Sequence, residues 1–204
     1  MRYLPAAAML ALIAPPAAAA SGDIPMVAIG LPFTPETPSP VAPAHPLYHR
    51  VEIGEIEDLP PTVGSSALNF IAAAKRSSIN AALRENFRRM NMLAPDAATA
   101  RTRLLVSWGG SHTPFRIASR NVATVTLHYR LVRIDNGRPL FDRDITTSAE
   151  GGGVDAAMRD NGIVRAAIAA NFASAANCLD HAAAGAVPGD CALVPGFSVS
   201  VRRR

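Results

Sequence analysis

The chain has 204 residues and a formal net charge of +4, from 20 lysines and arginines against 16 acidic residues, and only 5% of its residues are aromatic. A mild, scattered positive charge with few aromatics argues against nucleic-acid binding, which gathers basic and aromatic side chains along one surface. The length allows one ordinary domain with shorter segments at its ends.

Residues 1–20 have the features of a secretory signal peptide. Arg2 supplies a positive start, an apolar run follows around residues 6–14, and two prolines precede a small-residue stretch that ends at Ala20. A signal peptidase recognises this pattern, and the run is too short to span a membrane. The sequence therefore predicts cleavage near Ala20 and a periplasmic or secreted mature protein. A buried alanine-rich helix is the alternative.

The predicted mature chain has no residue suited to lipid attachment at its start, because position 21 is serine rather than cysteine. No later segment looks long and apolar enough to anchor in a membrane. We therefore expect neither a lipid anchor nor a transmembrane segment in the mature chain.

Residues 21–47 contain seven of the seventeen prolines and few bulky apolar side chains. Such a segment cannot bury enough surface to offset the entropy lost on ordering it. We expect a proline-rich disordered tether over residues 21–47 and a single domain over residues 48–204.

The first half of this domain shows one strand pattern followed by one helix pattern. Residues 48–56 alternate apolar and charged side chains, which predicts a strand. Residues 66–92 place apolar side chains three or four positions apart, which predicts a helix that ends at Asn91, before Pro95. The apolar side of that helix consists of Ile79, Leu83, Phe87 and Met90.

Three further strands are predicted in the middle of the chain. Residues 101–108 form the first, which the Gly109–Ser111 cluster should close. Residues 121–134 alternate most clearly between apolar and polar side chains. The Asn136-Gly137 pair favours a tight hairpin turn into a strand over residues 139–147. We expect Leu127 and Tyr129 on the apolar face, near Phe87 and Phe172, and Thr126 and His128 on the other face.

A second helix should follow the Gly151–Gly153 hinge, capped by Asp155, because Val164, Ile168 and Phe172 recur at a spacing of four. Phe197, Val199 and Val201 alternate like a short final strand. The sequence thus predicts an α+β fold: an antiparallel sheet of about four strands with two helices packed on one face. Its order is β-α-β-β-β-α, followed by a C-terminal extension over residues 177–204.

The only two cysteines, Cys178 and Cys191, flank a loop rich in glycine and proline. In an oxidising compartment this arrangement favours a disulfide. Two separate buried thiols are the alternative. A zinc site is not expected, because His181 is the only histidine nearby and structural zinc needs four ligands.

Three strings carry a resemblance to a known family: residues 79–83 leading to residues 93–95, the strand at 124–131, and residues 161–168 of the last helix. Over residues 48–177 they resemble the LPS-assembly lipoprotein LptE and related auxiliary proteins of envelope lipid transport. The resemblance implies a non-enzymatic envelope accessory protein that assists LPS or lipid transport or assembly through contacts with an envelope protein partner. Relatives commonly begin with a lipidated cysteine, whereas this chain has Ser21.

No pattern typical of a cofactor or metal site is present. The five histidines are scattered without ligand spacing, and Ser111-His112 follows glycines without a nucleophile elbow, which fits a polar turn. The five histidines are His45, His49, His112, His128 and His181. The C-terminal Arg202, Arg203 and Arg204 could touch anionic lipid or polysaccharide, although a solvated end is the simpler interpretation.

Two alternative functions stay open. One is an enzyme acting on envelope sugar or acyl groups, with Asp142, Asp144, His112 or His128 as acid and base, although the two aspartates could equally keep an edge strand soluble. The hexapeptide repeats of UDP-N-acetylglucosamine acyltransferases are absent from the sequence. The other is a small amphiphile-binding module, which requires an apolar cavity between sheet and helices.

Overall fold

The computed structural model describes residues 39–64, 74–114, 120–153, 156–185, 191 and 197–203. The predictions of a signal peptide, of cleavage near Ala20 and of most of the tether lie outside the described residues. So do the helix cap at Asp155 and the last arginine, Arg204.

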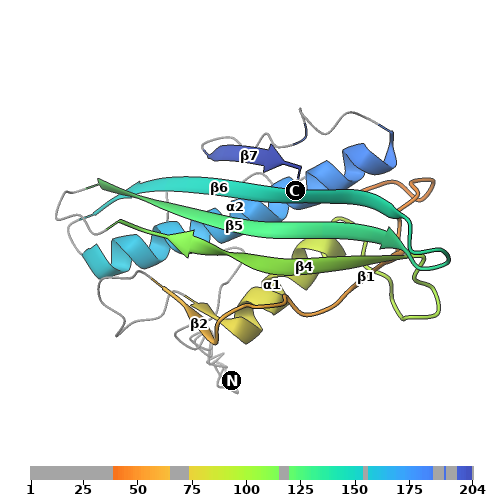
Figure 1. Cartoon of the computed structure of the whole chain (residues 1–204), viewed down its shortest axis with the longest axis horizontal. Coiled ribbons are helices and arrows are strands. Elements are labelled where there is room, and N and C mark those ends of the chain that lie inside the picture. Colours follow the sequence, from red (N-terminus) through yellow and green to blue (C-terminus); the bar gives the residue numbers. More distant parts are fainter. Residues whose placement is uncertain are drawn as a thin grey trace, which may run out of the picture.

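The protein is an α+β domain in which two helices lie behind a twisted sheet of five strands (Figure 1). This confirms the predicted fold class. The sheet order is β1-β4-β5-β6-β7, and β2 and β3 form a separate two-stranded sheet. The elements are β1 (Val51–Ile53), β2 (Thr62–Val63), β3 (Ala74–Lys75), α1 (Arg76–Arg89), β4 (Thr102–His112), β5 (Arg120–Arg133), β6 (Pro139–Gly152), α2 (Ala156–Ala183) and β7 (Ser198–Arg202).

The sheet is mixed rather than purely antiparallel, because β1 pairs with β4 in parallel. The chain passes through α1 between these two strands, and such a crossover returns it in the same direction. The other pairings, β4–β5, β5–β6 and β6–β7, are antiparallel as expected.

Two glycine clusters lie partly inside strands, although Gly109–Ser111 was expected to close a strand and Gly151–Gly153 to form a hinge before the second helix. Gly109 and Gly110 form an irregularity in β4, which continues to His112. A Cβ at Gly109 would lie 3.0 Å from the Thr126 carbonyl oxygen, so a larger residue would have to displace the neighbouring strand slightly. Likewise β6 runs through Gly151 and Gly152, because the long β5 offers backbone partners as far as Arg120.

Helix α1 is shorter at its start than the sequence predicts. Its first residue is Arg76, and Ala74 and Lys75 instead pair with β2 as the strand β3. Its end agrees with the prediction, since Asn91 adopts a positive φ of 57° directly after the helix.

The core lies between the sheet and the two helices. Leu127 and Tyr129 of β5, Phe87 of α1 and Phe172 of α2 are all 0% exposed and belong to one continuous cluster. The prediction for the apolar face is therefore confirmed. His128 lies on the opposite face, which is polar but partly buried rather than fully wet, since its side chain is only 14% exposed.

Helix α2 has a second cover besides the sheet. Phe197 and Val199 at the start of β7 pack against Ala170 and Ala173 of α2. By length and composition, its segment Arg159–Ala183 could cross a membrane, which the sequence analysis did not anticipate. In the structure 83% of its most apolar window is buried. Its apolar character is thus accounted for by packing within the domain.

The ordered domain begins before residue 48. Val41 and Leu47 are only 6% and 1% exposed, and the Val41 N–H donates to the Met90 carbonyl oxygen at 3.0 Å. Residues 39–47 therefore pack with the domain, whereas the sequence analysis placed them in the tether; Val41 and Leu47 are buried, and His45 contacts Asp180 of α2.

Cys178 and Cys191 form the predicted disulfide. Both are 0% exposed, and the Asn177 side-chain amide donates to the Cys191 carbonyl oxygen. The bond ties Cys191 to the buried side of α2.

We expect Phe172→Ala to lower the free energy of unfolding by about 3–5 kcal/mol, because it leaves a cavity beneath the sheet. His128→Ala should cost about 1 kcal/mol or less, because it removes only partly exposed contacts with Asp142 and Asp144 on the other face. Denaturant melts of both variants measure the difference. Equal losses would contradict the assignment of the two faces.

We expect the double variant Cys178→Ala/Cys191→Ala to lose about 3 kcal/mol of stability, because the closed loop no longer restricts the unfolded chain. Melts with and without reductant provide the check. Reductant should destabilise the natural protein to the level of the variant and leave the variant unchanged. A natural protein insensitive to reductant under unfolding conditions would contradict the expectation.

Candidate functional site

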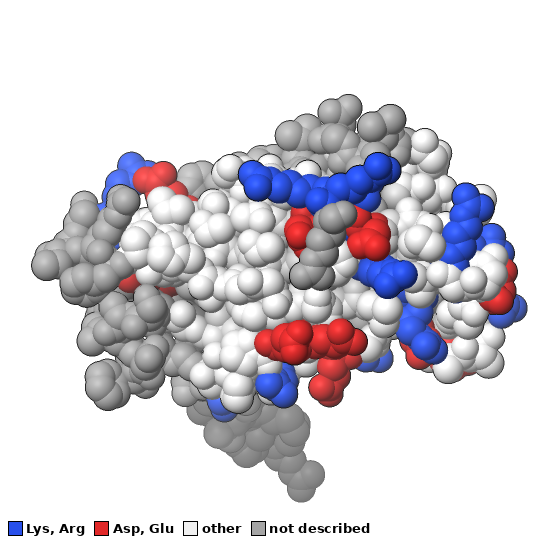
Figure 2. Space-filling view, viewed as in Figure 1, with Lys and Arg blue, Asp and Glu red and all other residues white. Residues whose placement is uncertain are grey.

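The outer face of the sheet, turned away from the helices, presents polar side chains in rows that cross the strands. The Thr124 and Ser148 hydroxyls lie 2.9 Å apart, as do those of Thr126 and Thr146. Ser198 and Ser200 of β7 extend these two rows. Figure 2 views this face and shows an uncharged area beside a more highly charged end of the sheet. The face is therefore hydrophilic without being strongly charged.

The next row brings together three of the residues considered for acid–base chemistry. His128 lies with Nδ1 2.9 Å from Asp144 and with Nε2 3.1 Å from Asp142. Arg130 approaches Asp142 at 3.7 Å, and Arg202 is the register partner of Asp144. The fourth candidate, His112, lies opposite Thr124 and away from this group.

The proximity of these groups does not by itself produce a nucleophile. Ser107 is the register partner of His128, beside a shallow depression of about 210 Å³. However, both ring nitrogens of His128 face carboxylates, and no hydrogen bond joins Ser107 to the ring among the described residues. A serine relay needs one ring nitrogen directed at the hydroxyl. The observed geometry instead suits charge pairing across the strands.

The interior contains an amide network that the sequence analysis missed. The fully buried Asn171 of α2 accepts a hydrogen bond from the Tyr129 hydroxyl at 2.7 Å. Its amide nitrogen donates to the Ile145 carbonyl oxygen at 2.8 Å and lies 3.1 Å from the Thr147 hydroxyl. Burial raises the pKa of Tyr129 well above its ordinary value, so the hydroxyl stays protonated and can donate.

A second buried polar group joins the first turns of α2 to β5. Asp160 receives the Arg159 guanidinium at 2.8 Å and the Asn121 amide at 3.1 Å. The side chains of Arg159 and Asp160 are only 2% and 6% exposed. This cluster positions α2 and lines none of the pockets described below.

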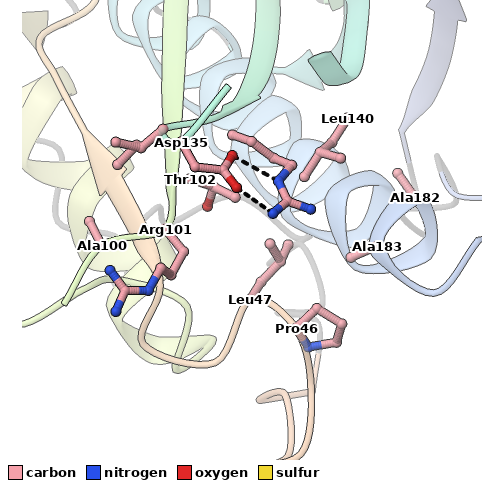
Figure 3. A pocket seen from close by; sticks show the side chains of 11 residues that line it. Pro46, Leu47, Ala100, Arg101, Thr102, Asp135, Leu140, Ala182 and Ala183 are labelled. Atoms are coloured by element: carbon pink, nitrogen blue, oxygen red, sulfur yellow. Dashed lines mark hydrogen bonds and ion pairs between the residues drawn. The ribbon is translucent and has the colours of Figure 1, made fainter. Parts of the chain in front are cut away.

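A concave pocket of about 550 Å³ lies at the end of the sheet that carries the β5–β6 turn (Figure 3). Parts of five segments surround it, and most of its lining is apolar. They are Pro46 and Leu47, the residues leading into β4 (Ala100, Arg101, Thr102), the residues leaving β5 (Arg133, Ile134, Asp135), Leu140 of β6, and Ala182 and Ala183 of α2. The pocket is thus at the end of the sheet and helix, not in the packed interior between them.

The lining of this pocket carries a net positive charge, because it includes two arginines, Arg101 and Arg133, and one carboxylate, Asp135. Arg133 donates to Asp135 at 3.0 and 2.5 Å. This ion pair lowers the pKa of Asp135 and raises that of Arg133, so both stay charged near neutral pH. Arg101 makes no side-chain hydrogen bond or ion pair within the described part of the chain.

The sequence analysis did not identify this pocket. Its lining comes from positions separated by more than a hundred residues, which only the tertiary fold brings together. A weak signal was present, because Ile134 and Leu140 are apolar residues on either side of a polar turn.

A neighbouring depression of about 480 Å³ lies along residues 39–46. His45 Nε2 lies 2.9 Å from Asp180 Oδ1 there, which pairs the N-terminal segment with the end of α2. Within the residues that the structure describes, no group of three or more histidines, cysteines or acidic residues could hold a metal ion.

The predicted basic end is only partly included in the described residues. Arg202 is the last residue of β7, and both Arg202 and Arg203 are exposed. Their guanidinium groups are therefore accessible from solvent at the edge of the sheet.

The sequence matches no protein-family model and is significantly similar to no curated protein. In structure the chain is similar to a Xanthomonas campestris protein of the DUF330 family, with a TM-score of 0.51 and 13% identity over 70% of this chain and 90% of that one. It is also similar to a candidate lipoprotein from Caulobacter crescentus, with a TM-score of 0.42 and 14% identity over 68% and 94% of the two chains. A PelC dodecamer from Paraburkholderia phytofirmans gives a TM-score of 0.36 and 14% identity over 66% and 89%. At these identities the first similarity establishes a shared fold and nothing further.

We expect Tyr129→Phe to cost about 1–3 kcal/mol of stability, because the buried Asn171 oxygen loses its donor and no water can replace it. Tyr48→Phe is the matched control. The Tyr48 hydroxyl has no hydrogen bond among the described residues, so its loss should stay within about 0.5 kcal/mol. Denaturant unfolding of both variants measures the difference, and similar losses would contradict a stabilising role of the network.

Proposed function

We propose that this protein is a non-enzymatic accessory protein of the bacterial cell envelope that assists LPS or lipid transport or assembly by binding an envelope protein partner. The observation that carries the proposal is the open edge of β7. The exported character comes from the signal-peptide pattern of residues 1–20, and the type of process from the resemblance to LptE and related auxiliary proteins. The fold shared with the Xanthomonas campestris protein is compatible with this assignment.

The two edges of the five-stranded sheet differ. At the β1 edge, the Val51 N–H donates to the Met92 carbonyl oxygen, and the Ala94 N–H donates to the Val51 carbonyl oxygen. Residues 92–94, which follow α1, therefore cover this edge. At the other edge, β7 pairs only with β6 among the described residues. Open edges bind other strands readily, and proteins normally block them unless they serve for recognition.

The side chains around β7 suit a specific contact. Ser198 and Ser200 are exposed on the outer face, while Val199 and Val201 pack against the core. A partner strand could therefore add to the sheet through backbone hydrogen bonds without disturbing the core. The exposed Arg202 and Arg203 would favour a partner segment that carries acidic side chains.

Photo-crosslinking in the native host tests the proposal. A photoreactive residue at Ser200 should capture a reproducible envelope protein, whereas the same residue at the exposed Ala97, in the loop before β4, should not. The double variant Arg202→Glu/Arg203→Glu should reduce the crosslink at Ser200 by about tenfold, because complementary charges then repel. Arg120→Glu, at the far end of β5, is the control and should leave it within about twofold.

Two results would overturn the proposal. One is equal capture from Ser200 and Ala97, which indicates chance encounters. The other is the absence of any crosslinked partner, with the protein behaving as a free monomer in envelope extracts.

A further inference from the structure

Exposed large apolar side chains are concentrated at the pocket beside the β5–β6 turn. The described residues include three such side chains, Leu105, Ile134 and Leu140, which are 37%, 43% and 40% exposed. Two of the three, Ile134 and Leu140, line this pocket. Single exposed apolar residues are ordinary on protein surfaces, but a cluster in a concave site indicates binding.

The pocket has a firm floor and a suitable size. Leu47, Ala100 and Thr102 are 1%, 4% and 5% exposed, so packing against the core holds them in place. Its volume of about 550 Å³ lies within the range of about 300–1,000 Å³ that is typical of small-molecule sites. A ligand of that size could bury Ile134 and Leu140 without any movement of the backbone.

The apolar wall and the free positive charge lie on opposite sides of the pocket. In Figure 3, Arg101 lies on one side, with its guanidinium turned outward, and Leu140, Ala182 and Ala183 lie on the other, with Leu47 between them. Because Asp135 already neutralises Arg133, Arg101 is the cation of this pocket that has no partner among the described residues. A molecule lying on the aliphatic side chains would therefore have its other end at the Arg101 side of the pocket, where this exposed side chain can turn its guanidinium toward it.

We propose that this pocket binds a single-chain anionic amphiphile, such as a fatty acid. Its acyl chain would lie on Leu47, Ile134 and Leu140 against the end of α2, and its head group would accept hydrogen bonds from Arg101. A carboxylate or phosphate is the natural partner of a guanidinium, and it gains most where the rest of the ligand is apolar. The site uses no residue of β7, so it is independent of the partner contact proposed above.

Fluorescence titration tests this site with the full purified protein after delipidation. The probe is a dansyl-labelled undecanoic acid, and dodecanoate and dodecanol are the competitors. We expect saturable binding of one probe per chain and stronger displacement by dodecanoate than by dodecanol.

Two pairs of matched variants locate the bound molecule. Leu140→Glu should weaken probe binding by about tenfold or more, because it places a charge in the apolar wall, and Ile134→Glu is a second variant of the same kind. Leu105→Glu makes the same change at the third exposed apolar side chain and should stay within about twofold. Arg101→Gln should weaken dodecanoate by about tenfold and dodecanol by less than about twofold, while Arg120→Gln should affect neither.

The proposal would be overturned by a lack of saturable binding, by equal losses in Leu140→Glu and Leu105→Glu, or by an Arg101→Gln variant that still prefers dodecanoate. Binding of phosphatidylglycerol vesicles that is unaffected by Leu140→Glu, without displacement of the probe by dodecanoate, would also overturn it, because it would indicate attraction to a lipid surface. Thermal melts of each variant establish that it is folded. Loss of the β7 crosslink with retained probe binding would affect the partner proposal alone.

Discussion

The apolar face of the β5–β6 hairpin must be covered, and its burial beneath α2 is the interaction on which the rest of the structure depends. Five alternate residues of β5, from Ala123 to Leu131, are 0% exposed on this face. The alanines of α2 let the helix approach closely, while Phe172 fills the space between helix and sheet. Because α2 is apolar on most sides, it needs a further cover. Cys191, bonded to Cys178, and Phe197 and Val199 at β7 contribute to it.

Polar groups at this interface make the packing specific. Apolar side chains alone would allow α2 to slide or rotate on the sheet at small cost. The Asn171 amide prevents this, because its bonds to Tyr129 and to the Ile145 carbonyl oxygen are satisfied in only one position of the helix. Asp160, Arg159 and Asn121 define the other end of α2 in the same way.

Because the helices cover one face of the sheet, the polar and exposed groups lie at its edges, at its ends or on its outer face. The outer face pairs its own charges and hydroxyls, as the contacts of His128 with Asp142 and Asp144 show. Among the described residues, β7 has no strand partner on its outer edge, and the pocket beside the β5–β6 turn has exposed apolar side chains and a guanidinium, that of Arg101, without a side-chain partner. These two places therefore carry the functional proposals, whereas the His128 cluster resembles a catalytic group only in its composition.

The α+β class, the hairpin with its Asn136-Gly137 turn, the inward face of β5 and the Cys178–Cys191 bond could be predicted from the amino-acid sequence. Each of these follows from local periodicity, turn chemistry or compartment, which need no distant contacts. The parallel pairing of β1, the passage of β4 and β6 through their glycines, the docking of residues 39–47 and the pocket around Leu47 and Leu140 could not be predicted in this way and became visible only in the folded chain. These features depend on contacts between residues that are far apart in the chain. Local sequence patterns do not indicate which of these residues meet when the chain folds.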